Sequence, residues 1–239
     1  RTIGEVGLRA LPTLTVVMVV AWLFAAQALA QAPIRNELLT LDPMHEGQDA
    51  GRSVAIAGGI AVVGAPYGLP SGSAYIFDLE TGTQLHHLQP GDLSNGAFGW
   101  SVATDGVRVA VGAYQDTHPG APFSGGGSVD VFDAATGEEL YKIFSPGSFL
   151  EAQFGSALAI EGNVLAVGAQ QDDAENIGNA IVSGSVYLID LTTGAMLHKL
   201  KPSNTLVRGF GLSVACQTVP TGSGAWNMPT LRSGGTEGP

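Results

Sequence analysis

The sequence predicts an all-β fold built of four-stranded repeats, and three observations support this prediction. Glycine is abundant, with 34 of 239 residues, while only 13% of the residues are charged. Short runs of Val, Ala and Ile are separated by glycine-containing breaks, which is typical of strands joined by tight turns. Two sequence phrases also recur in the same order along the chain. Recurrence at intervals of about 50 residues indicates a repeat architecture.

The first repeated phrase is an apolar run, a glycine break and a second apolar run that ends in Gly-Ala. It begins at Gly51, Phe98 and Phe154, and it starts a fourth time at Phe210. The Gly-Ala glycines of the three complete copies are Gly64, Gly112 and Gly168. Each copy predicts two short strands whose small and β-branched residues cover the neighbouring repeat. The glycines within these strands allow one sheet to approach the next closely.

The second repeated phrase begins with Gly-Ser at 72, 127 and 184 and continues as an alternating run of Val, Tyr and Phe. This run predicts a third strand. It ends in Asp-x-x-Thr-Gly, which predicts a tight turn, because Asp can bond its own backbone and Gly can adopt positive φ. A fourth short strand follows and ends before Pro90, Pro146 or Pro202, as suits a strand at a sheet edge.

Each unit therefore has the strand number and length of one propeller blade. We predict an all-β fold, a β-propeller of four-stranded blades, with about three complete blades plus two partial ones in an incomplete or open ring. The complete blades run from about 50 to 202. A lone outer strand is expected at 38–41 and a lone inner strand at 212–215. The outer strand is of the kind that completes the last blade and closes a ring.

The two ends of the chain differ from the repeats. Arg1 and Arg9 flank an apolar run that is followed by Ala28-Leu29-Ala30, so residues 1–30 are predicted to be a secretory signal peptide. A retained membrane anchor is the alternative. Residues 31–215 are assigned to the partial propeller. Residues 216–239 are rich in Gly, Ser and Pro and are predicted to form an irregular or disordered tail.

Composition excludes several kinds of site. The formal net charge is −11, so the chain lacks the basic surface that nucleic-acid binding requires. Cys216 is the single cysteine, which rules out an internal disulfide and a cysteine-based zinc site. We find no serine–histidine–acid order, phosphate-binding loop or metalloprotease helix. The chain is therefore not expected to be an enzyme.

The two phrases together resemble the FG-GAP repeat, which forms the propeller blades of integrin α chains and of many secreted bacterial proteins. The resemblance covers about residues 50–215. It implies a seven-bladed propeller, an extracellular or cell-surface location, and a role in binding or adhesion. This chain supplies fewer blades, so it either belongs to a longer protein or forms an open arc.

Many proteins with this repeat carry a calcium loop between the first two strands of a blade. The matching loops here lie at 57–60, 104–107 and 161–163. None has the three or more oxygen-bearing side chains that a calcium ion prefers. No metal site and no cofactor are therefore expected.

The densest group of carboxylates follows the third Gly-Ala and includes Asp172, Asp173 and Glu175. Asp116 lies in the equivalent loop of the preceding repeat. Because loops between propeller strands commonly carry binding residues, these four acids are the candidate ligand-binding residues. The alternative is an ordinary solvated loop, since the spacing of the acids is irregular.

Aromatic residues and histidines provide weaker candidates. Trp100 follows a Phe-Gly pair, where it could recognise a ligand, although packing between blades or over a loop is the favoured interpretation. His86, His87 and His198 fall in outer strands. Because neighbouring residues on a strand point to opposite faces, His86 and His87 are not expected to bind one metal ion.

The function predicted from the sequence is a non-catalytic binding or adhesion module that is secreted, periplasmic or at the cell surface. Its partner is expected to be a protein or carbohydrate at the cell surface, without nucleic acid and without membrane contact beyond the signal segment. Two alternatives stay open. Residues 133–140 resemble a segment of quinoprotein propeller enzymes, and the chain could instead be a structural piece of a larger surface protein.

Overall fold

The structure is a computed structural model that describes residues 49–92, 96–119, 125–146, 152–172, 183–203, 207–217 and 230–237. All of these residues belong to the second of two units, Leu41–Pro239. The signal peptide predicted at 1–30 and the outer strand predicted at 38–41 lie outside the described residues.

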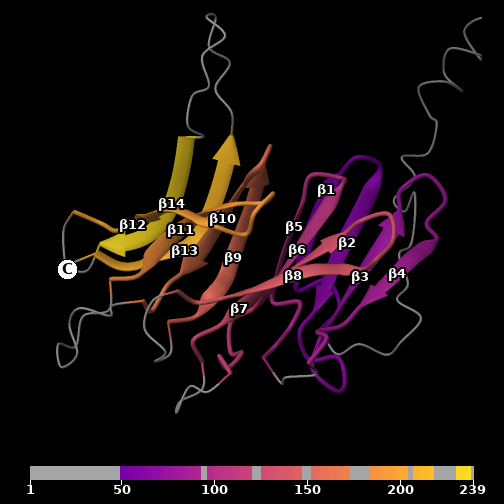
Figure 1. The fold of residues 1–239 in the computed structure, drawn as a ribbon, viewed down its shortest axis with the longest axis horizontal. Helices are drawn as coiled ribbons and strands as arrows, with labels where there is room; N and C mark the ends of the chain where they lie inside the picture. The colour runs from indigo at the N-terminus through magenta and orange to yellow at the C-terminus, as the bar shows by residue number, and fades with distance from the viewer. Residues whose placement is uncertain are drawn as a thin grey trace, which may run out of the picture. The chain divides into compact units, whose positions relative to one another are not determined.

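Three antiparallel four-stranded sheets follow one another along the chain, and in each sheet the strands pair in sequence order (Figure 1). Sheet 1 comprises β1 (Ser53–Ala57), β2 (Ile60–Ala65), β3 (Ser73–Asp78) and β4 (Gln84–Leu88). Sheet 2 comprises β5 (Ser101–Thr104), β6 (Arg108–Ala113), β7 (Ser128–Asp133) and β8 (Glu139–Phe144). Sheet 3 comprises β9 (Phe154–Glu161), β10 (Val164–Ala169), β11 (Ser185–Asp190) and β12 (Met196–Leu200). The prediction of three four-stranded, propeller-like units is confirmed.

The Asp-x-x-Thr-Gly phrase forms the turn between the third and fourth strands of every sheet. Asp78 Oδ1 accepts hydrogen bonds from the backbone N–H and the hydroxyl of Thr81, at 2.7 and 2.8 Å. Asp133 and Asp190 accept the corresponding backbone bond in sheets 2 and 3. These backbone hydrogen bonds hold the pKa of all three carboxyl groups below its usual value. The glycines that end the turns have positive φ: 74° at Gly82, 72° at Gly137 and 69° at Gly194.

Two glycines of the first phrase meet wherever one sheet packs on the next. A Cβ atom at Gly64 would lie 2.1 Å from the carbonyl oxygen of Gly99. The same distance would separate a Cβ atom at Gly112 from Gly155 O, and one at Gly168 from Gly211 O. Any side chain there would push two backbones apart. The Gly-Ala glycine of one repeat and the Phe-Gly glycine of the next therefore form a single contact, which confirms that these glycines permit close approach.

Apolar side chains fill the space between successive sheets. Ile76 of sheet 1 belongs to the same core cluster as Phe98 and Phe132, whose rings pack edge-on at 5.9 Å between centroids. Phe154 packs edge-on against Tyr187 at 5.4 Å in the cluster that joins sheets 2 and 3. Each repeat thus buries a face of its neighbour, as expected when a single sheet cannot bury both of its own faces.

The fourth copy of the repeat begins with β13 (Val207–Gln217), which pairs with β14 (Thr230–Glu237) in a two-stranded sheet. Phe210, Val214 and Cys216 of β13 pack on sheet 3. The prediction of an irregular tail from 216 onwards is wrong for β14. The backbone of β13 needs hydrogen-bond partners along its edge, and this requirement outweighs the turn-rich composition. Residues 218–229 and 238–239 lie outside the described residues.

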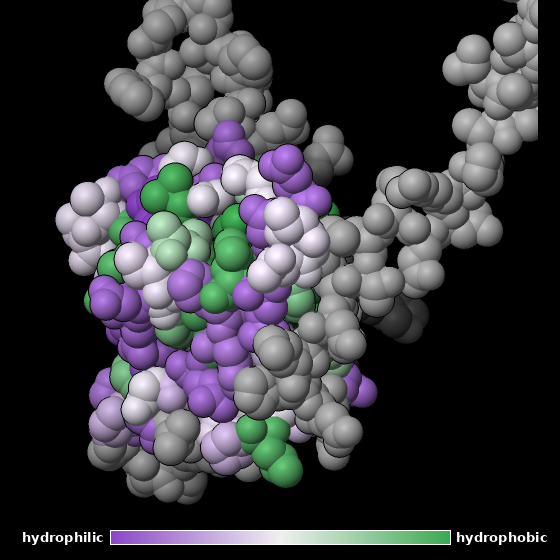
Figure 2. Space-filling model, turned by 90° about the vertical axis from the view of Figure 1, so that its right-hand side faces the viewer, coloured by the Kyte–Doolittle hydropathy of each residue, from purple (hydrophilic) through white to green (hydrophobic). Residues whose placement is uncertain are grey.

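Figure 2 views the molecule from the side on which β3 and β4 lie in Figure 1. Apolar residues appear there in small groups separated by polar residues. Val54, Ile56 and Leu69 are among the large apolar side chains that are more than half exposed. Within the described part of this face, apolar side chains do not merge into one broad surface.

Candidate functional site

The acids predicted from the sequence do not form an exposed loop where the structure describes them. Asp116 and Asp172 are each the third residue after Gly-Ala, and each is only 1% exposed. Asp173 and Glu175 lie outside the described residues. Asp116 and Asp172 are therefore not the ordinary solvated acids of the alternative interpretation: each carboxylate is buried against a lysine of the outer strand, because a buried charge requires a partner. Ligand binding by these loops stays a prediction.

In sheet 2, the carboxylate of Asp116 is held by three groups. Lys142 Nζ lies 2.7 Å from Asp116 Oδ2, and Ser128 donates its hydroxyl to the same oxygen at 2.7 Å. The backbone N–H of Thr117 donates to Oδ1, also at 2.7 Å. Lys142 Nζ also contacts Asp92 Oδ2 at 2.9 Å. One lysine of β8 therefore fixes the loop after β6.

Asp130 of β7 adds another carboxylate to this lysine. It lies directly opposite Lys142 in the β7–β8 pairing, is 0% exposed, and has its Oδ1 3.8 Å from Lys142 Nζ. Neither oxygen of Asp130 has a hydrogen-bond partner among the described residues. Burial raises the pKa of Asp130 to about 7, although the charge of Lys142 opposes the rise. Burial alone would lower the pKa of Lys142, but Asp130 and the other two carboxylates raise it.

Sheet 3 has the same lysine–aspartate pair with a different neighbour. Lys199 Nζ lies 2.8 Å from Asp172 Oδ2. Tyr187, at the position that Asp130 has in sheet 2, donates its hydroxyl to the same oxygen at 2.5 Å. Burial and this hydrogen bond raise the pKa of the Tyr187 phenol. In sheet 1, the equivalent positions hold Gly68, Tyr75 and His87, and the two rings stack with centroids 4.8 Å apart.

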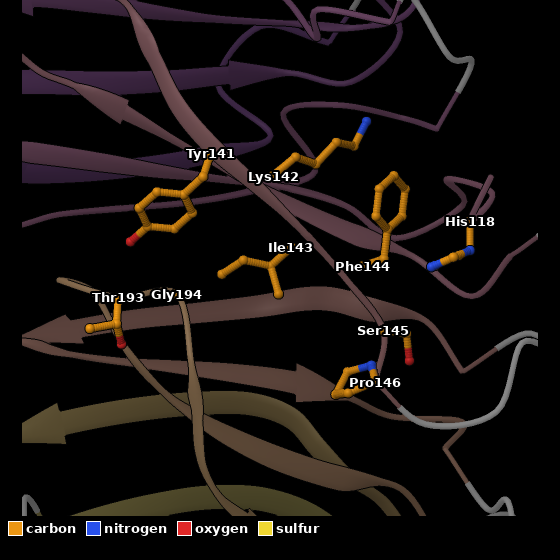
Figure 3. Close-up of a pocket in the computed structure, with 9 residues that line it drawn as sticks. All are labelled: His118, Tyr141, Lys142, Ile143, Phe144, Ser145, Pro146, Thr193 and Gly194. Carbon is orange, nitrogen blue, oxygen red and sulfur yellow. The ribbon is translucent and has the colours of Figure 1, made fainter.

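A hollow of about 410 Å³ lies beside β8, where sheet 2 meets the β11–β12 turn of sheet 3. Figure 3 shows Tyr141 and Lys142 leaving β8 in opposite directions. The Tyr141 hydroxyl donates to Leu191 O at 2.6 Å, and the His118 ring packs edge-on against Phe144 at 4.9 Å. The hollow is thus bordered by groups that join the two sheets.

The loops matched to calcium sites are occupied by internal contacts. Asp105 pairs with Arg108 at 2.9 Å, and Arg108 also donates to Asn163 Oδ1 at 2.8 Å in the equivalent loop of sheet 3. Although burial opposes the effect, backbone hydrogen bonds and Arg108 lower the pKa of Asp105. Across the described residues, no group of three or more His, Cys, Asp or Glu side chains is arranged to hold a metal ion.

A second hollow, of about 340 Å³, lies among the inner strands, and we call it the inner-strand pocket. Residues from all four copies of the first phrase line it. Arg52, Trp100, Ser156 and Leu212 occupy the same position of the repeat, directly after the glycine, and each lies at this pocket. Gln170 completes one side and donates a hydrogen bond to Gln153. Repetition of the fold thus brings four chemically different side chains together.

Arg52 and Trp100 form the most distinctive part of this pocket. The Arg52 guanidinium lies 4.0 Å from the Trp100 ring centroid, and Trp100 packs against Tyr114 at 4.4 Å. Arg52 is exposed, while Trp100 and Tyr114 are half-buried. Burial, together with Tyr67 nearby, raises the pKa of Tyr114, although Arg52 opposes the rise. No carboxylate pairs with Arg52 in the part of the chain that the structure describes.

Sequence reasoning identified Trp100 but missed its partners. It favoured packing between blades, and the half-buried ring does contact neighbouring side chains, yet it also borders an open pocket. Arg52, Tyr114 and Gln170 were not predicted. The available signal was the position after each glycine, which varies as Arg, Trp, Ser and Leu within otherwise similar phrases.

The outer-strand histidines lie on different faces, as alternation along a strand predicts. His86 forms a hydrogen bond with Ala135 O of sheet 2, at 2.9 Å. His87 instead bonds the hydroxyl of Ser73 and stacks on Tyr75. His198 is exposed on β12. These contacts confirm that His86 and His87 point in opposite directions.

Comparison with protein families agrees with this arrangement. A family model described as FG-GAP repeat matches residues 45–77 and 149–189. The chain carries FG-GAP repeats. The matched stretches take in β1 to β3 in the first sheet and β9 to β11 in the third. Sheet 2, which lies outside the matched stretches, has the same strand order.

Two solved structures align with this chain at low sequence identity. The crystal structure of Saccharomyces cerevisiae Sqt1 aligns with a TM-score of 0.50 and 14% identity, over 74% of this chain and 38% of that chain. The crystal structure of the computationally designed Ika8 protein aligns with a TM-score of 0.49 and 20% identity, over 84% and 46% of the two chains. The FG-GAP chain therefore spans less than half the length of either structure. A comparison with curated proteins found no match.

Among the residues that the structure describes, no helix has the length and apolar character needed to cross a membrane.

Proposed function

We propose that this FG-GAP repeat chain is a non-catalytic binding module, secreted or displayed at the cell surface, whose partner contacts the inner-strand pocket. The observation that carries the proposal is the Arg52–Trp100–Tyr114 cluster at an open hollow. Arginine, tryptophan and tyrosine are the residues that most often dominate the energy of protein interfaces. The cluster is held by separate repeats, so it forms only when the sheets have assembled.

The arrangement favours a protein partner over a carbohydrate. A sugar would stack on the face of an aromatic ring, but Arg52 already covers one face of Trp100 and Tyr114 packs against the same ring. Arg52 keeps its guanidinium exposed and unpaired with any described carboxylate. A guanidinium binds a carboxylate through two parallel hydrogen bonds. We therefore expect the partner to be a protein that presents an acidic side chain beside an apolar one.

The test selects ligands from a displayed peptide library and from an immobilised glycan array. We expect peptides with acidic residues to be selected, and we expect Arg52→Ala and Trp100→Ala each to weaken their binding about tenfold or more. Leu85→Ala is the control, because Leu85 is 45% exposed on β4 and does not line the pocket. Glycans selected in place of peptides, or peptides that bind Arg52→Ala unchanged, would contradict the proposed site.

Export is a separate part of the proposal. It is supported by the basic and apolar segment before Ala28-Leu29-Ala30. Expressed behind an initiator methionine in a secreting bacterium, the chain should be exported and should begin at Gln31. An exported chain that keeps residues 1–30 would favour the anchor, and a chain retained in the cytoplasm would refute export.

The incomplete or open ring is likewise a proposal, and the mass of the purified chain in solution would show whether copies associate.

A further inference from the structure

The lysine in sheet 2 differs from the lysine in sheet 3 in a way that suggests a covalent modification. Lys142 is surrounded by carboxylates of Asp92, Asp116 and Asp130, whereas Asp172 is the one carboxylate paired with Lys199 among the residues that the structure describes. Two of the acids at Lys142 are completely buried, and Lys142 itself is only 13% exposed. One ammonium group therefore faces two buried carboxyl groups and one partly exposed carboxylate.

We propose that Lys142 and Asp116 form an intramolecular amide bond, with Asp130 as the acid that promotes it. The Lys142 ammonium first gives one proton to the Asp116 carboxylate, and the resulting neutral amine attacks the Asp116 carboxyl carbon, forming one C–N bond. One C–O bond of Asp116 breaks, and that oxygen leaves as water. An ammonium and a carboxylate thus become one neutral amide and one water molecule, with no oxidant or other reactant.

The position of each group suits its part in this step. Lys142 Nζ lies 2.7 Å from Asp116 Oδ2, so the reacting groups are already in contact. Ser128 and the Thr117 backbone hold the two Asp116 oxygens in place. Amide formation between separate molecules in water is unfavourable, but fixed contact raises the effective concentration to about 10⁵–10⁸ M. Burial also favours the neutral product over the ion pair.

Asp130 is suited to carry protons in this step. Its two oxygens have no hydrogen-bond partner among the described residues, and it directly opposes Lys142 across the β7–β8 ladder. Its raised pKa keeps part of its population protonated near neutral pH. The protonated acid can donate to the oxygen that leaves Asp116, and the carboxylate can then accept a proton from the attacking nitrogen.

The other sheets provide internal controls. In sheet 3, the pair Lys199–Asp172 is equally close at 2.8 Å, but Tyr187 replaces the acid. The pKa of this phenol is raised, so it remains protonated and cannot exchange protons as a carboxyl group does. Sheet 1 lacks both the lysine and the aspartate. We therefore expect the bond in sheet 2 alone.

Peptide mapping with a protease that cleaves after glutamate tests the proposal. Cleavage after Glu80, Glu138, Glu139 and Glu151 separates Asp116, in peptide 81–138, from Lys142, in peptide 140–151. In the folded natural-sequence protein we expect these peptides to remain joined, with a combined mass lower by one water. Peptide 162–175, which contains Asp172, should be released free. Recovery of peptides 81–138 and 140–151 as separate species with unmodified masses would overturn the proposal.

Matched variants assign the roles. Lys142→Arg and Asp116→Ala should abolish the joined species, while Asp92→Ala should leave it unchanged. Asp130→Asn should slow its appearance in freshly refolded protein by about 100-fold or more. Circular dichroism would establish that each variant is folded before digestion. Unchanged linkage in folded Asp130→Asn would refute the role of Asp130. Loss of the linkage in folded Asp92→Ala would mean that Lys142 is joined to Asp92 and would contradict the assignment to Asp116.

Discussion

Sheets 2 and 3 place a lysine–aspartate pair at the same point of the repeat but surround it differently. Asp172 Oδ2 accepts a hydrogen bond from the Tyr187 hydroxyl, a neutral donor, while Asp172 Oδ1 has no hydrogen-bond partner among the described residues. The pair in sheet 2 has Asp130 at that position, a second acid with no hydrogen-bond partner among the described residues. One substitution within the repeat thus replaces a neutral hydroxyl donor by a second buried carboxyl group beside the lysine.

The comparison separates the residues that recur in every repeat from the buried third-strand residue that differs between repeats. The glycine contacts, the Asp-x-x-Thr-Gly turns and the apolar clusters recur because every sheet must pack on its neighbour. The position occupied by Tyr75, Asp130 and Tyr187 lies on the same strand in each sheet, yet its chemistry differs. The side chain at this buried position of the third strand can therefore differ between repeats that share the same strand order.

Removal of each lysine should give the largest contrast. Lys142→Met removes the cation and, with it, the proposed bond to Asp116. It leaves Asp116 and Asp130 buried without a partner and should reduce the free energy of unfolding by about 3–5 kcal/mol. Lys199→Met leaves Asp172 with the Tyr187 hydroxyl, so the loss should be smaller, about 1–3 kcal/mol. Urea unfolding of the two variants measures the difference. Equal losses would mean that Asp130 and Tyr187 are energetically equivalent.

The shared packing should respond alike in both sheets. Gly112→Ala and Gly168→Ala place a Cβ atom against a neighbouring backbone carbonyl, so each should cost about 3 kcal/mol. Gly162→Ala is the control, because a Cβ atom there meets nothing within 4 Å, although φ is +56°. Its cost should be about 1–2 kcal/mol, from backbone strain. The account of the glycine contact fails if the melting temperatures of all three variants coincide.

Asp130 of sheet 2 should also make the stability of the protein depend on pH. Asp130 has a pKa of about 7 in the folded protein against 3.8 for an ordinary Asp, so the folded state binds the extra proton between these values. Stability should therefore fall as pH rises from about 4 to about 7, by at most about 1.4 kcal/mol per pH unit. Asp130→Asn should remove this fall.

Melting temperatures across this pH range provide the measurement. The turn carboxyls of Asp78, Asp133 and Asp190 have lowered pKa values, so their contribution is lost as pH falls through those values. They are present in both proteins and cancel in the comparison. If wild type and Asp130→Asn show parallel curves, Asp130 does not titrate as described.

The smallest effect is expected at the inner-strand pocket. Arg52→Ala removes a cation from the face of Trp100 and should cost about 0.5–1 kcal/mol, because Arg52 is exposed. Thermal melting would measure this change, and intrinsic tryptophan fluorescence should also change as Trp100 becomes more solvated. A loss as large as that for Lys142→Met would place the cluster in the core of the fold instead of at a binding surface.

The sequence was sufficient for the features that depend on local patterns. Alternation predicted the third strands, and the Asp-x-x-Thr-Gly phrase predicted the turns, because neighbouring residues determine both. Gly64 and Gly99 could be identified as close-approach residues because the same pair recurs in the later copies. The β13–β14 pairing was missed, since β14 has no counterpart in the repeats and pairs across residues 218–229.

The candidate sites depended on contacts between distant residues. Asp116 looked like a loop acid, because its partners Ser128 and Lys142 lie on later strands. Arg52 and Trp100 meet only when sheets 1 and 2 pack together. No single phrase contains either arrangement. A closer comparison of the variable position after each glycine could have shown Arg52 and Trp100 as equivalent residues.

The most direct test of the difference between sheets 2 and 3 is the titration of Asp130 itself. Its side-chain carboxyl carbon can be followed by nuclear magnetic resonance across the pH range, with Asp130→Asn used to assign the signal. We predict a midpoint near pH 7, well above that of Asp133 in the exposed turn of the same sheet. A midpoint of about 4, the value of an ordinary aspartate, would contradict the account.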